Sequence, residues 1–427
     1  MPPRPGVRTR SSLRRRDVDD VDGDDASASK PNLLPADAWI AELDLAGFKE
    51  DVAELGKELR AAQGPEDVAH LKKILLWANV CTLIGMCTMA LPPMYVFPAI
   101  ALSLGSFARW TMVAHHTCHG GYDKVDPTKK HNRWTYAVGS LWRRANDWFD
   151  WMLPEAWNVE HNNSHHYHLG ENADPDLVEN NLVSMRESSA PMIVKYAKVA
   201  AVVSTWKWLY YAPNTWKELQ INRMRKSGVK FDERAATTPF MLTGMFSPEF
   251  DGGWVNITGL FSEVLLPYFL YRFVLSPLPL LFLFGKGAFV NAILNLCLAE
   301  LFTNLHSFVV IASNHAGHDL YRFATHCKPK SGTFYLRQVI SSVDFWCGGD
   351  VNDFLHGFLN YQIEHHCWPD LSMRSYQKGH PLLKEICKRH GVPWVQEDCF
   401  TRTKKTLDIM VGKSSMRQYP IEWERPL

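Results

Sequence analysis

Histidines with the spacing of metal ligands recur along this chain. The segment HHTCH contains His115 and His119, which are four residues apart and therefore share one face of a helix, where they can bind one ion together. The segment HNNSHH contains His161 and His165 at the same spacing, and the adjacent His166 can reach toward a second ion. Imidazole is a common ligand of transition metals, so these segments predict metal-dependent chemistry.

Two further segments hold the remaining candidates. SNHAGH contains Asn314 at the start of an N-x3-H pattern that ends at His318, with His315 as the competing histidine. NYQIEHH places a doubled imidazole behind a glutamine, and its candidate ligands are Gln362, His365 and His366. Further candidates for ligation, or for contacts to the ligands, are His315, Asn314, His116 and His356.

The candidate ligands also indicate which metal is bound. They are almost all nitrogen donors, and they exceed the four ligands that one zinc ion usually takes, so they divide naturally between two ions. The nine cysteines are scattered without a CxxC pair, which argues against a zinc finger and indicates free thiols in a reducing compartment. We therefore predict a dinuclear non-haem iron site with open positions for O2.

Two long apolar blocks must position these histidines. Residues 74–112 carry no charge before Arg109, and this block is too long for one crossing of a bilayer, which needs about 20 residues. The Pro92–Pro93 pair interrupts the block, so the sequence predicts two helices at about 74–92 and 95–114. A buried hairpin in a soluble protein is the alternative.

The second block, residues 265–312, predicts another helical hairpin, with its turn at the GKG of residues 285–287. It contains two ionisable residues, Arg272 and Glu300. Unpaired charge inside a membrane is costly, so these side chains are expected to face each other or a polar cavity. The alternative is that Arg272 extends along a tilted helix to the membrane surface.

The distribution of basic residues predicts a topology. Basic residues concentrate before the first block and between the two blocks, so the positive-inside rule places both termini and residues 115–260 on the cytoplasmic side. All four histidine segments then lie at one membrane face. The expected fold is all-α and integral to the membrane, with four transmembrane helices in two hairpins and a cytosolic helical cap that carries the histidines.

Composition divides the chain into four parts. We expect a disordered N-terminal tail at 1–34, a soluble helical segment at 35–72, the membrane domain with the dimetal site at 73–395 and a cytosolic C-terminal tail at 396–427. Lysines interrupt the apolar stretch 190–213, which predicts a helix lying on the membrane surface. No apolar segment follows the basic N-terminus, so no secretory signal is expected. The net charge of +1 gives no support to nucleic-acid binding.

The three segments HHTCH, HNNSHH and QIEHH, with two apolar hairpins arranged between them, resemble the histidine boxes of the integral-membrane fatty acid desaturases. The stretch HGFLNYQIEHHCWPDL is similar to the third-box region of the front-end acyl desaturases, where Gln replaces the first histidine. The resemblance covers about residues 70–395. It implies a diiron enzyme that uses O2 and two electrons to introduce a double bond into an acyl chain.

The resemblance also implies a ligand set. Box histidines ligate iron in that family, which assigns this role to His115, His119, His161, His165, His166, His365 and His366, with Gln362 at the family's glutamine position. Related acyl-CoA desaturases add a histidine near the end of the fourth helix, which suggests His318 and leaves His315 open. Acidic residues expected to orient the imidazoles are Glu160, Asp174, Asp176, Asp350 and Glu364.

The chain departs from the family in two ways. His116 stands where the first box usually has Asp, and the HPGG haem motif of a fused cytochrome b5 domain does not occur. Electrons are therefore expected from a separate protein, cytochrome b5 or ferredoxin. The expected substrate is an acyl lipid or acyl-CoA. The expected location is a multi-pass position in the endoplasmic reticulum, with a plastid membrane as the alternative.

Two other functions stay open at this point. A lipid or fatty acyl hydroxylase shares the first hydrogen abstraction with a desaturase, so ligand spacing does not separate the two. A membrane transporter or a metal-binding scaffold is the alternative without chemistry. Transporters usually carry internal repeats and polar groups at the membrane midplane. This chain has no evident repeat and gathers its polar groups at one face, which favours the enzyme.

Overall fold

The computed structural model describes residues 33–231, 238–246 and 255–424. The predicted tail at 1–34 lies outside the described residues except for its last two. The described chain is mostly helical, as the sequence predicts, and its one small sheet pairs β1 (Tyr321–Arg322) in parallel with β2 (Arg417–Gln418). Short helices connect the longer ones: α1 Trp39–Glu42, α6 Leu141–Asp147, α7 Pro154–Trp157, α8 His166–His168, α9 Val178–Asn181, α10 Val183–Glu187 and α18 Asp350–Leu355.

The first apolar block forms two helices that pack against each other, with the predicted break at the proline pair. Helix α3 spans Pro65–Thr88, and α4 spans Phe97–Ala108. Helix α3 begins earlier than predicted because Gly64 and Pro65 make an N-terminus there, with the Asp67 carboxylate accepting the Gly64 N–H at 2.7 Å. The chain after α4 stays helical, through a π-helical segment Arg109–Ala114 and helix α5 (His115–Cys118).

The second apolar block forms a helical run from Ile257 to Leu275, which includes α14 (Ile257–Gly259) and α15 (Leu266–Phe269), followed by α16 (Leu278–Ile311). Gly285 interrupts α16 with φ 81° and ψ −179°, at the position where the sequence predicts the turn. Arg272 Nε lies 3.0 Å from Glu300 Oε1, so residues on the two sides of Gly285 come together. The predicted contact between Arg272 and Glu300 is therefore confirmed.

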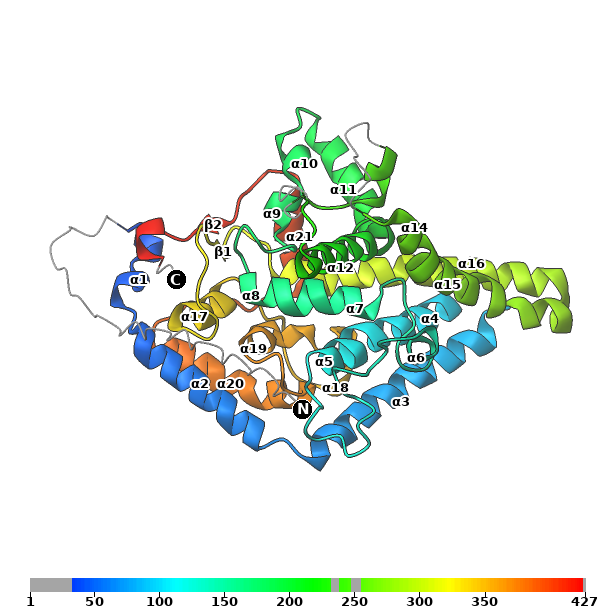
Figure 1. Cartoon of the computed structure of the whole chain (residues 1–427), viewed down its shortest axis with the longest axis horizontal. Coiled ribbons are helices and arrows are strands. Elements are labelled where there is room, and N and C mark those ends of the chain that lie inside the picture. Colours follow the sequence, from blue (N-terminus) through cyan, green and yellow to red (C-terminus); the bar gives the residue numbers. More distant parts are fainter. Residues whose placement is uncertain (1–32, 232–237, 247–254, 425–427) are drawn as a thin grey trace, which may run out of the picture.

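Three of these helical runs are long and apolar enough to cross a membrane: Pro65–Thr88, Ile257–Leu275 and Leu278–Asn314. They extend to one end of the molecule (Figure 1). Their large apolar side chains stay exposed, among them Leu83 at 63%, Phe282 at 78% and Phe284 at 70%. Soluble proteins rarely expose so many apolar groups together, so these helices fit a lipid environment. Residues 97–114 are helical but are not among the three, and the four-crossing arrangement stays a prediction.

The stretch 190–213 forms α11 (Met192–Trp206) and a π-helical segment Lys207–Tyr211, which continue into α12 (Ala212–Ser227). Helix α11 packs against α16. Lys195 and Lys207 are both buried, and Lys207 donates to Asp150 Oδ2 at 2.7 Å, so two of the interrupting lysines belong to the interior. Placement of this helix on a membrane surface stays a prediction.

The remaining helices form a body beside the apolar ones (Figure 1). Helix α2 (Leu45–Ala61) packs on α17 (Gly332–Ile340) and α20 (Met373–Arg389), and it buries Phe48 and Val52 against them. Helix α19 (Gln362–Cys367) lies between α17 and α20. Burial of this amphipathic face, rather than full solvation, explains the helical pattern of the 35–72 segment.

The C-terminal residues pack into this body, whereas the sequence predicted a tail there. Helix α21 (Cys399–Met410) buries Arg402 and Thr406 completely, and Arg402 donates to Asp319 Oδ1 at 2.7 Å. Strand β2 follows and pairs with β1. Asp319, which is far away in the sequence, pairs with both Arg402 and Lys405 of this helix.

Candidate metal centre

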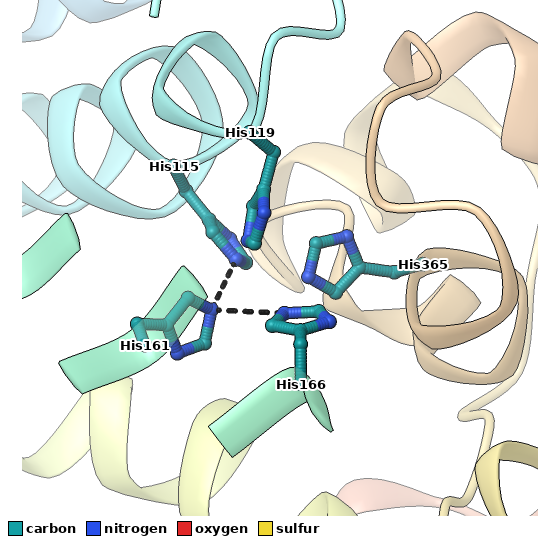
Figure 2. A group of neighbouring side chains, drawn as sticks. All are labelled: His115, His119, His161, His166 and His365. Carbon is teal, nitrogen blue, oxygen red and sulfur yellow. Dashed lines mark hydrogen bonds between the residues drawn. The ribbon is translucent and has the colours of Figure 1, made fainter. Parts of the chain in front are cut away.

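Five imidazoles converge from segments that are far apart in the sequence (Figure 2). They come from the helical segment around α5, from the π-helical segment Asn158–His165 with α8, and from α19. Each offers one nitrogen, and these nitrogens all lie within 4.8 Å of one another. The group, which we call the five-histidine cluster, contains His115, His119, His161, His166 and His365. All five are buried.

A second group adjoins the first. His165, His315 and His366 also bring their ligand nitrogens within 4.8 Å of one another, and we call them the three-histidine cluster. The His166 and His366 rings stack with centroids 4.3 Å apart, so the two clusters touch. The Gln362 side-chain amide lies 2.8 Å from His315 Nε2, which places the glutamine of the third box at this second cluster. Its buried Oε1 has no hydrogen-bond partner, and a half-turn of the amide would offer that oxygen as a ligand.

The second box divides its histidines in a way that α-helical spacing does not predict. His161 and His166 join the five-histidine cluster, with their Nε2 atoms 3.3 Å apart, whereas His165 joins the three-histidine cluster. The chain is π-helical over Asn158–His165. The wider π turn brings residues five apart onto one face, and such turns are frequent at functional sites.

Hydrogen bonds on the outer side fix the orientation of five imidazoles. In each, the Nδ1 atom faces an oxygen outside the clusters. The partners are Thr111 O for His115 at 3.2 Å, Asp174 Oδ1 for His165 at 2.8 Å, Ser341 O for His315 at 3.3 Å, the Tyr376 hydroxyl for His365 at 3.3 Å and Gln338 Oε1 for His366 at 3.1 Å. With a proton on Nδ1, the Nε2 lone pair is free to bind a metal.

The electrostatics keep most of these rings neutral. Burial lowers the pKa of His115 and of His315 to about 3, and it lowers the pKa of His161, His166 and His365 well below the usual range. Neutral imidazole is the form that binds a metal.

His165 differs from the other rings. Burial lowers its pKa, but the charge and hydrogen bond of Asp174 outweigh burial and leave the pKa raised. The raised pKa favours a second proton on the His165 ring. A metal at this cluster would compete with that proton for the ring nitrogen.

The clusters fit metal ions on the chemistry of their donors. His119 Nε2 and His365 Nε2 are buried and have no hydrogen-bond partner. Buried polar atoms nearly always have a partner, so two nitrogens without one inside the same cluster indicate an ion. Two adjoining sets of nitrogen donors suit two transition-metal ions.

The structure separates the two histidines that the sequence left open. His315 follows α16 and belongs to the three-histidine cluster. His318 is exposed and lies in neither cluster, although the N-x3-H pattern favoured it. The chain leaves the α-helix at Ile311 and passes through a 3-10 turn (Ala312–Asn314), so the register of an α-helix no longer applies at His318.

Three other candidates lie outside both clusters. His116 is buried behind the five-histidine cluster, with its ring 5.5 Å from the ring of His365. His356 faces its own backbone, and its Nδ1 lies 2.9 Å from Asn352 O. Asn314 donates through Nδ2 to two backbone carbonyl oxygens. These contacts give His356 and Asn314 structural roles in positioning the chain next to the clusters.

The sequence did not identify most of the residues that hydrogen-bond to the outer nitrogens of the histidines. Asp174 was among the acidic candidates, but no local pattern marks Thr111, Gln338, Ser341 or Tyr376 as neighbours of histidines. Gln338 and Tyr376 lie on α17 and α20, which pack on α2 and α19. Their position depends on tertiary packing rather than on spacing in the sequence.

Comparisons with known proteins agree with this arrangement. The family model described as "Fatty acid desaturase" matches residues 91–398. This chain belongs to the fatty acid desaturase family. The match begins within the first apolar block and includes every histidine of both clusters, so the resemblance seen in the three boxes is confirmed.

Individual relatives cover shorter segments of this desaturase-family chain. Delta(8)-fatty-acid desaturase 1 of Arabidopsis thaliana is 29% identical over 24% of this chain and 24% of its own length. Delta(5) fatty acid desaturase A of Dictyostelium discoideum is 26% identical over 32% of this chain and 29% of its own. NADPH-dependent stearoyl-CoA 9-desaturase of Mycobacterium tuberculosis is 32% identical over 22% and 21%. The chain thus spans less than a third of these relatives. No solved structure matches it.

An apolar cavity of about 130 Å³ reaches the histidines of this desaturase-family chain from one side. Histidines of both clusters contribute to its wall, as does Gln362. The opposite walls are aromatic and aliphatic, and they include Trp110, Trp206 and Phe308. A narrow apolar space beside nitrogen donors suits a hydrocarbon chain.

A second cavity, of about 590 Å³, reaches the histidines from another side. His119, His166 and His366 contribute to its wall. Basic residues also line this second cavity, namely Lys57, Arg60, Lys124, Arg133 and Lys330. The side chains of Lys57, Arg60 and Arg133 are paired with acidic residues, while Lys124 and Lys330 are exposed. Histidines of the two clusters therefore line both an apolar cavity and a basic one.

Proposed function

We propose that this chain is a membrane-bound diiron fatty acyl desaturase, which introduces a double bond into an acyl chain with O2 and two electrons from a separate donor. The observation that carries the proposal is the convergence of eight imidazoles, seven of them buried and His315 half-buried, in two adjoining clusters that line an apolar cavity. An acyl lipid or acyl-CoA is the substrate class. The proposed location is the endoplasmic reticulum, with a plastid membrane as the alternative.

The residues assigned to metal binding follow the two clusters. His115, His119, His161, His166 and His365 would hold one iron, and His165, His315, His366 and Gln362 would hold the other. When bound, the two irons supply the O2-dependent oxidation of an unactivated methylene, which acid–base catalysis by side chains cannot achieve. The overall reaction balances as R–CH2–CH2–R′ + O2 + 2 e⁻ + 2 H⁺ giving R–CH=CH–R′ + 2 H2O.

The chain's own residues bind and orient the substrate. The apolar cavity would hold the acyl segment against His115, His161 and His315, which line it. Trp157 lies in the same wall and stacks on the His161 ring, with centroids 4.5 Å apart. Large buried rings exclude water from the reacting carbons and hold the methylenes at a fixed position along the clusters.

The basic cavity supports a role for a separate electron carrier. Cytochrome b5 or ferredoxin would approach His119, His166 and His366 at the basic cavity, whose wall shares no residue with that of the apolar cavity. Lysines at the rim of such a cavity attract an acidic partner and speed its association. The separation of the two cavities lets electrons arrive without displacement of the substrate.

Desaturation is favoured over hydroxylation by the relatives, which carry the names of desaturases acting on fatty acids or stearoyl-CoA. The metal geometry is shared by both reactions, so the product decides between them. Loss of two hydrogens from a lipid identifies a desaturase, and gain of one oxygen identifies a hydroxylase.

The test is expression of the full chain in yeast, with profiling of total lipids by mass spectrometry. We expect a new unsaturated acyl chain with the wild type and none with His365→Ala. His318→Ala is the matched control, because this exposed histidine lies outside both clusters, and we expect it to retain the product. An unchanged lipid profile in the wild type, with iron present in the purified protein, would count against the proposal.

A further inference from the structure

Another group of side chains of the types that bind metals lies outside the two clusters, at the protein surface. His168 Nδ1 lies 2.9 Å from Glu171 Oε2, and His326 Nδ1 lies 2.6 Å from the same oxygen. The three ligand atoms all lie within 4.8 Å of one another. Two imidazole nitrogens and one carboxylate oxygen form a donor set that zinc and similar divalent ions bind in proteins.

The carboxylate is held in place from behind. Glu171 is 2% exposed, and its other oxygen, Oε1, accepts from Arg337 Nη1 at 2.6 Å and from the Cys327 N–H at 3.2 Å. These contacts fix Oε2 toward the two histidines. A ligand that is already fixed in position loses little conformational entropy when it binds a metal.

The local charge also favours a cation. Arg337 is shared between the carboxylates of Glu171 and Glu424, and its Nη2 lies 3.5 Å from Glu424 Oε2. All three side chains are buried, so two negative charges face one positive charge in this corner. The net charge of minus one offsets part of the cost of bringing a divalent ion to the site.

The site is open to solvent on its outer side. The His326 side chain is 59% exposed and the His168 side chain 36% exposed. An ion can therefore enter from solution and keep a water molecule as a further ligand. This accessibility distinguishes the surface group from the two buried clusters.

We propose that His168, Glu171 and His326 form a binding site for a zinc-type divalent ion that clips two distant segments together. The segments are the end of α8 with the loop that follows it, and the loop after β1. They are already joined by the Phe323 N–H, which donates to Gly170 O at 2.8 Å. The first loop continues to Asp174, which orients His165, and the second leads to α17, which carries Gln338 next to His366. A bound ion therefore stabilises two outer partners of the three-histidine cluster.

The test compares zinc content among purified full-length variants that carry iron. Each protein is dialysed against buffered zinc, and zinc and iron per chain are measured by mass spectrometry. We expect His326→Ala and the double variant His168→Ala with His326→Ala to bind one zinc fewer than the wild type, with iron unchanged. His318→Ala is the matched control, because it removes an exposed histidine from outside the group, and we expect it to equal the wild type.

A second readout addresses the clip itself. Zinc should raise the melting temperature of the wild type and of His318→Ala, and it should leave that of His326→Ala unchanged. Equal zinc content in the wild type and His326→Ala would overturn the proposal and leave the group as hydrogen-bonded side chains without an ion. This outcome does not depend on lipid products, so it is independent of the proposed desaturase activity.

Discussion

Asp174 Oδ1 lies 2.8 Å from His165 Nδ1, and both side chains are 2% exposed. The other carboxylate oxygen of Asp174 accepts the backbone N–H of Gly170 at 3.0 Å. The carboxylate is therefore fixed by its own loop and in turn fixes the imidazole. Such outer contacts set the orientation and the basicity of a metal-binding histidine.

The Asp174→Asn variant should weaken metal binding at the three-histidine cluster, although it removes none of the metal ligands. Loss of the charged hydrogen bond should lower iron retention or activity about 10-fold to 100-fold, the usual effect of an outer partner. Iron content after dialysis against a chelator and the yield of unsaturated product measure this.

Asp350→Asn is the matched control for this variant. Asp350 was an equal candidate in the sequence, but the structure places it in an exposed pair with Lys73. A similar loss of iron from both variants would contradict the role assigned to Asp174.

The sequence predicted the convergence of the boxes but not their internal assignment. Spacing of four residues identified His115 and His119 as a pair, and the structure brings them together. The second box divides its histidines between the clusters because its chain is π-helical. No pattern of residue types in the sequence predicts that π-helical segment. His315, rather than His318, reaches the cluster because the α-helix ends at Ile311, and helix ends depend on packing more than on composition.

Charges in apolar surroundings were more predictable. A lone Arg or Glu in an uncharged block needs a partner or a polar cavity, and of the arrangements that this requirement allowed the structure shows the direct contact of Arg272 with Glu300. The C-terminal helix α21 shows the opposite case. Its polar sequence gave no sign that Arg402 would be fully buried, because its partner Asp319 lies 83 residues away.

The Arg272–Glu300 pair should make a large contribution to stability. Trp151 Nε1 donates to Glu300 Oε2 at 2.9 Å and the Tyr268 hydroxyl donates to Oε1 at 3.4 Å, so removal of the arginine alone leaves a buried carboxylate with neutral donors and no positive charge. Arg272→Met should therefore lower the free energy of unfolding by about 3–5 kcal/mol, as for other broken buried pairs. Thermal unfolding in detergent measures the change.

The double variant Arg272→Met with Glu300→Gln is the control for that prediction. It removes both charges, so it should recover most of the lost stability. A double variant as unstable as Arg272→Met would show that packing at these positions, rather than an uncompensated charge, accounts for the loss.

Stability should also fall at acidic pH through Asp319. Burial raises the pKa of this carboxyl, but the charges and hydrogen bonds of Arg402 and Lys405 outweigh burial and lower the pKa to about 2. Since the pKa is lower in the folded state than in the unfolded state, the contribution is complete above about pH 4 and is lost as pH falls toward 2. Because Asp319 is partly solvated, we expect the loss to be on the order of 1 kcal/mol.

Asp319→Asn should remove this part of the pH dependence. The variant is expected to be less stable than the wild type at pH 6 and equal to it near pH 2, as measured by denaturant unfolding at both pH values. Parallel curves for the two proteins, with the same difference at both pH values, would contradict a titration of Asp319.

The basic cavity predicts how the electron donor is recognised. Lys57 and Lys330 line the cavity that reaches His119 and His366, and neither residue contributes to a histidine cluster. The variant Lys57→Glu with Lys330→Glu should slow reduction by an acidic donor several-fold, and the effect should shrink as salt screens the charges. The measurement is the rate of product formation at varied donor concentration, at low and high ionic strength.

Lys388→Glu is the control, since its side chain is 79% exposed and lies outside the cavity lining. A loss of rate in both variants, or a loss independent of salt, would place the electron donor elsewhere on the surface.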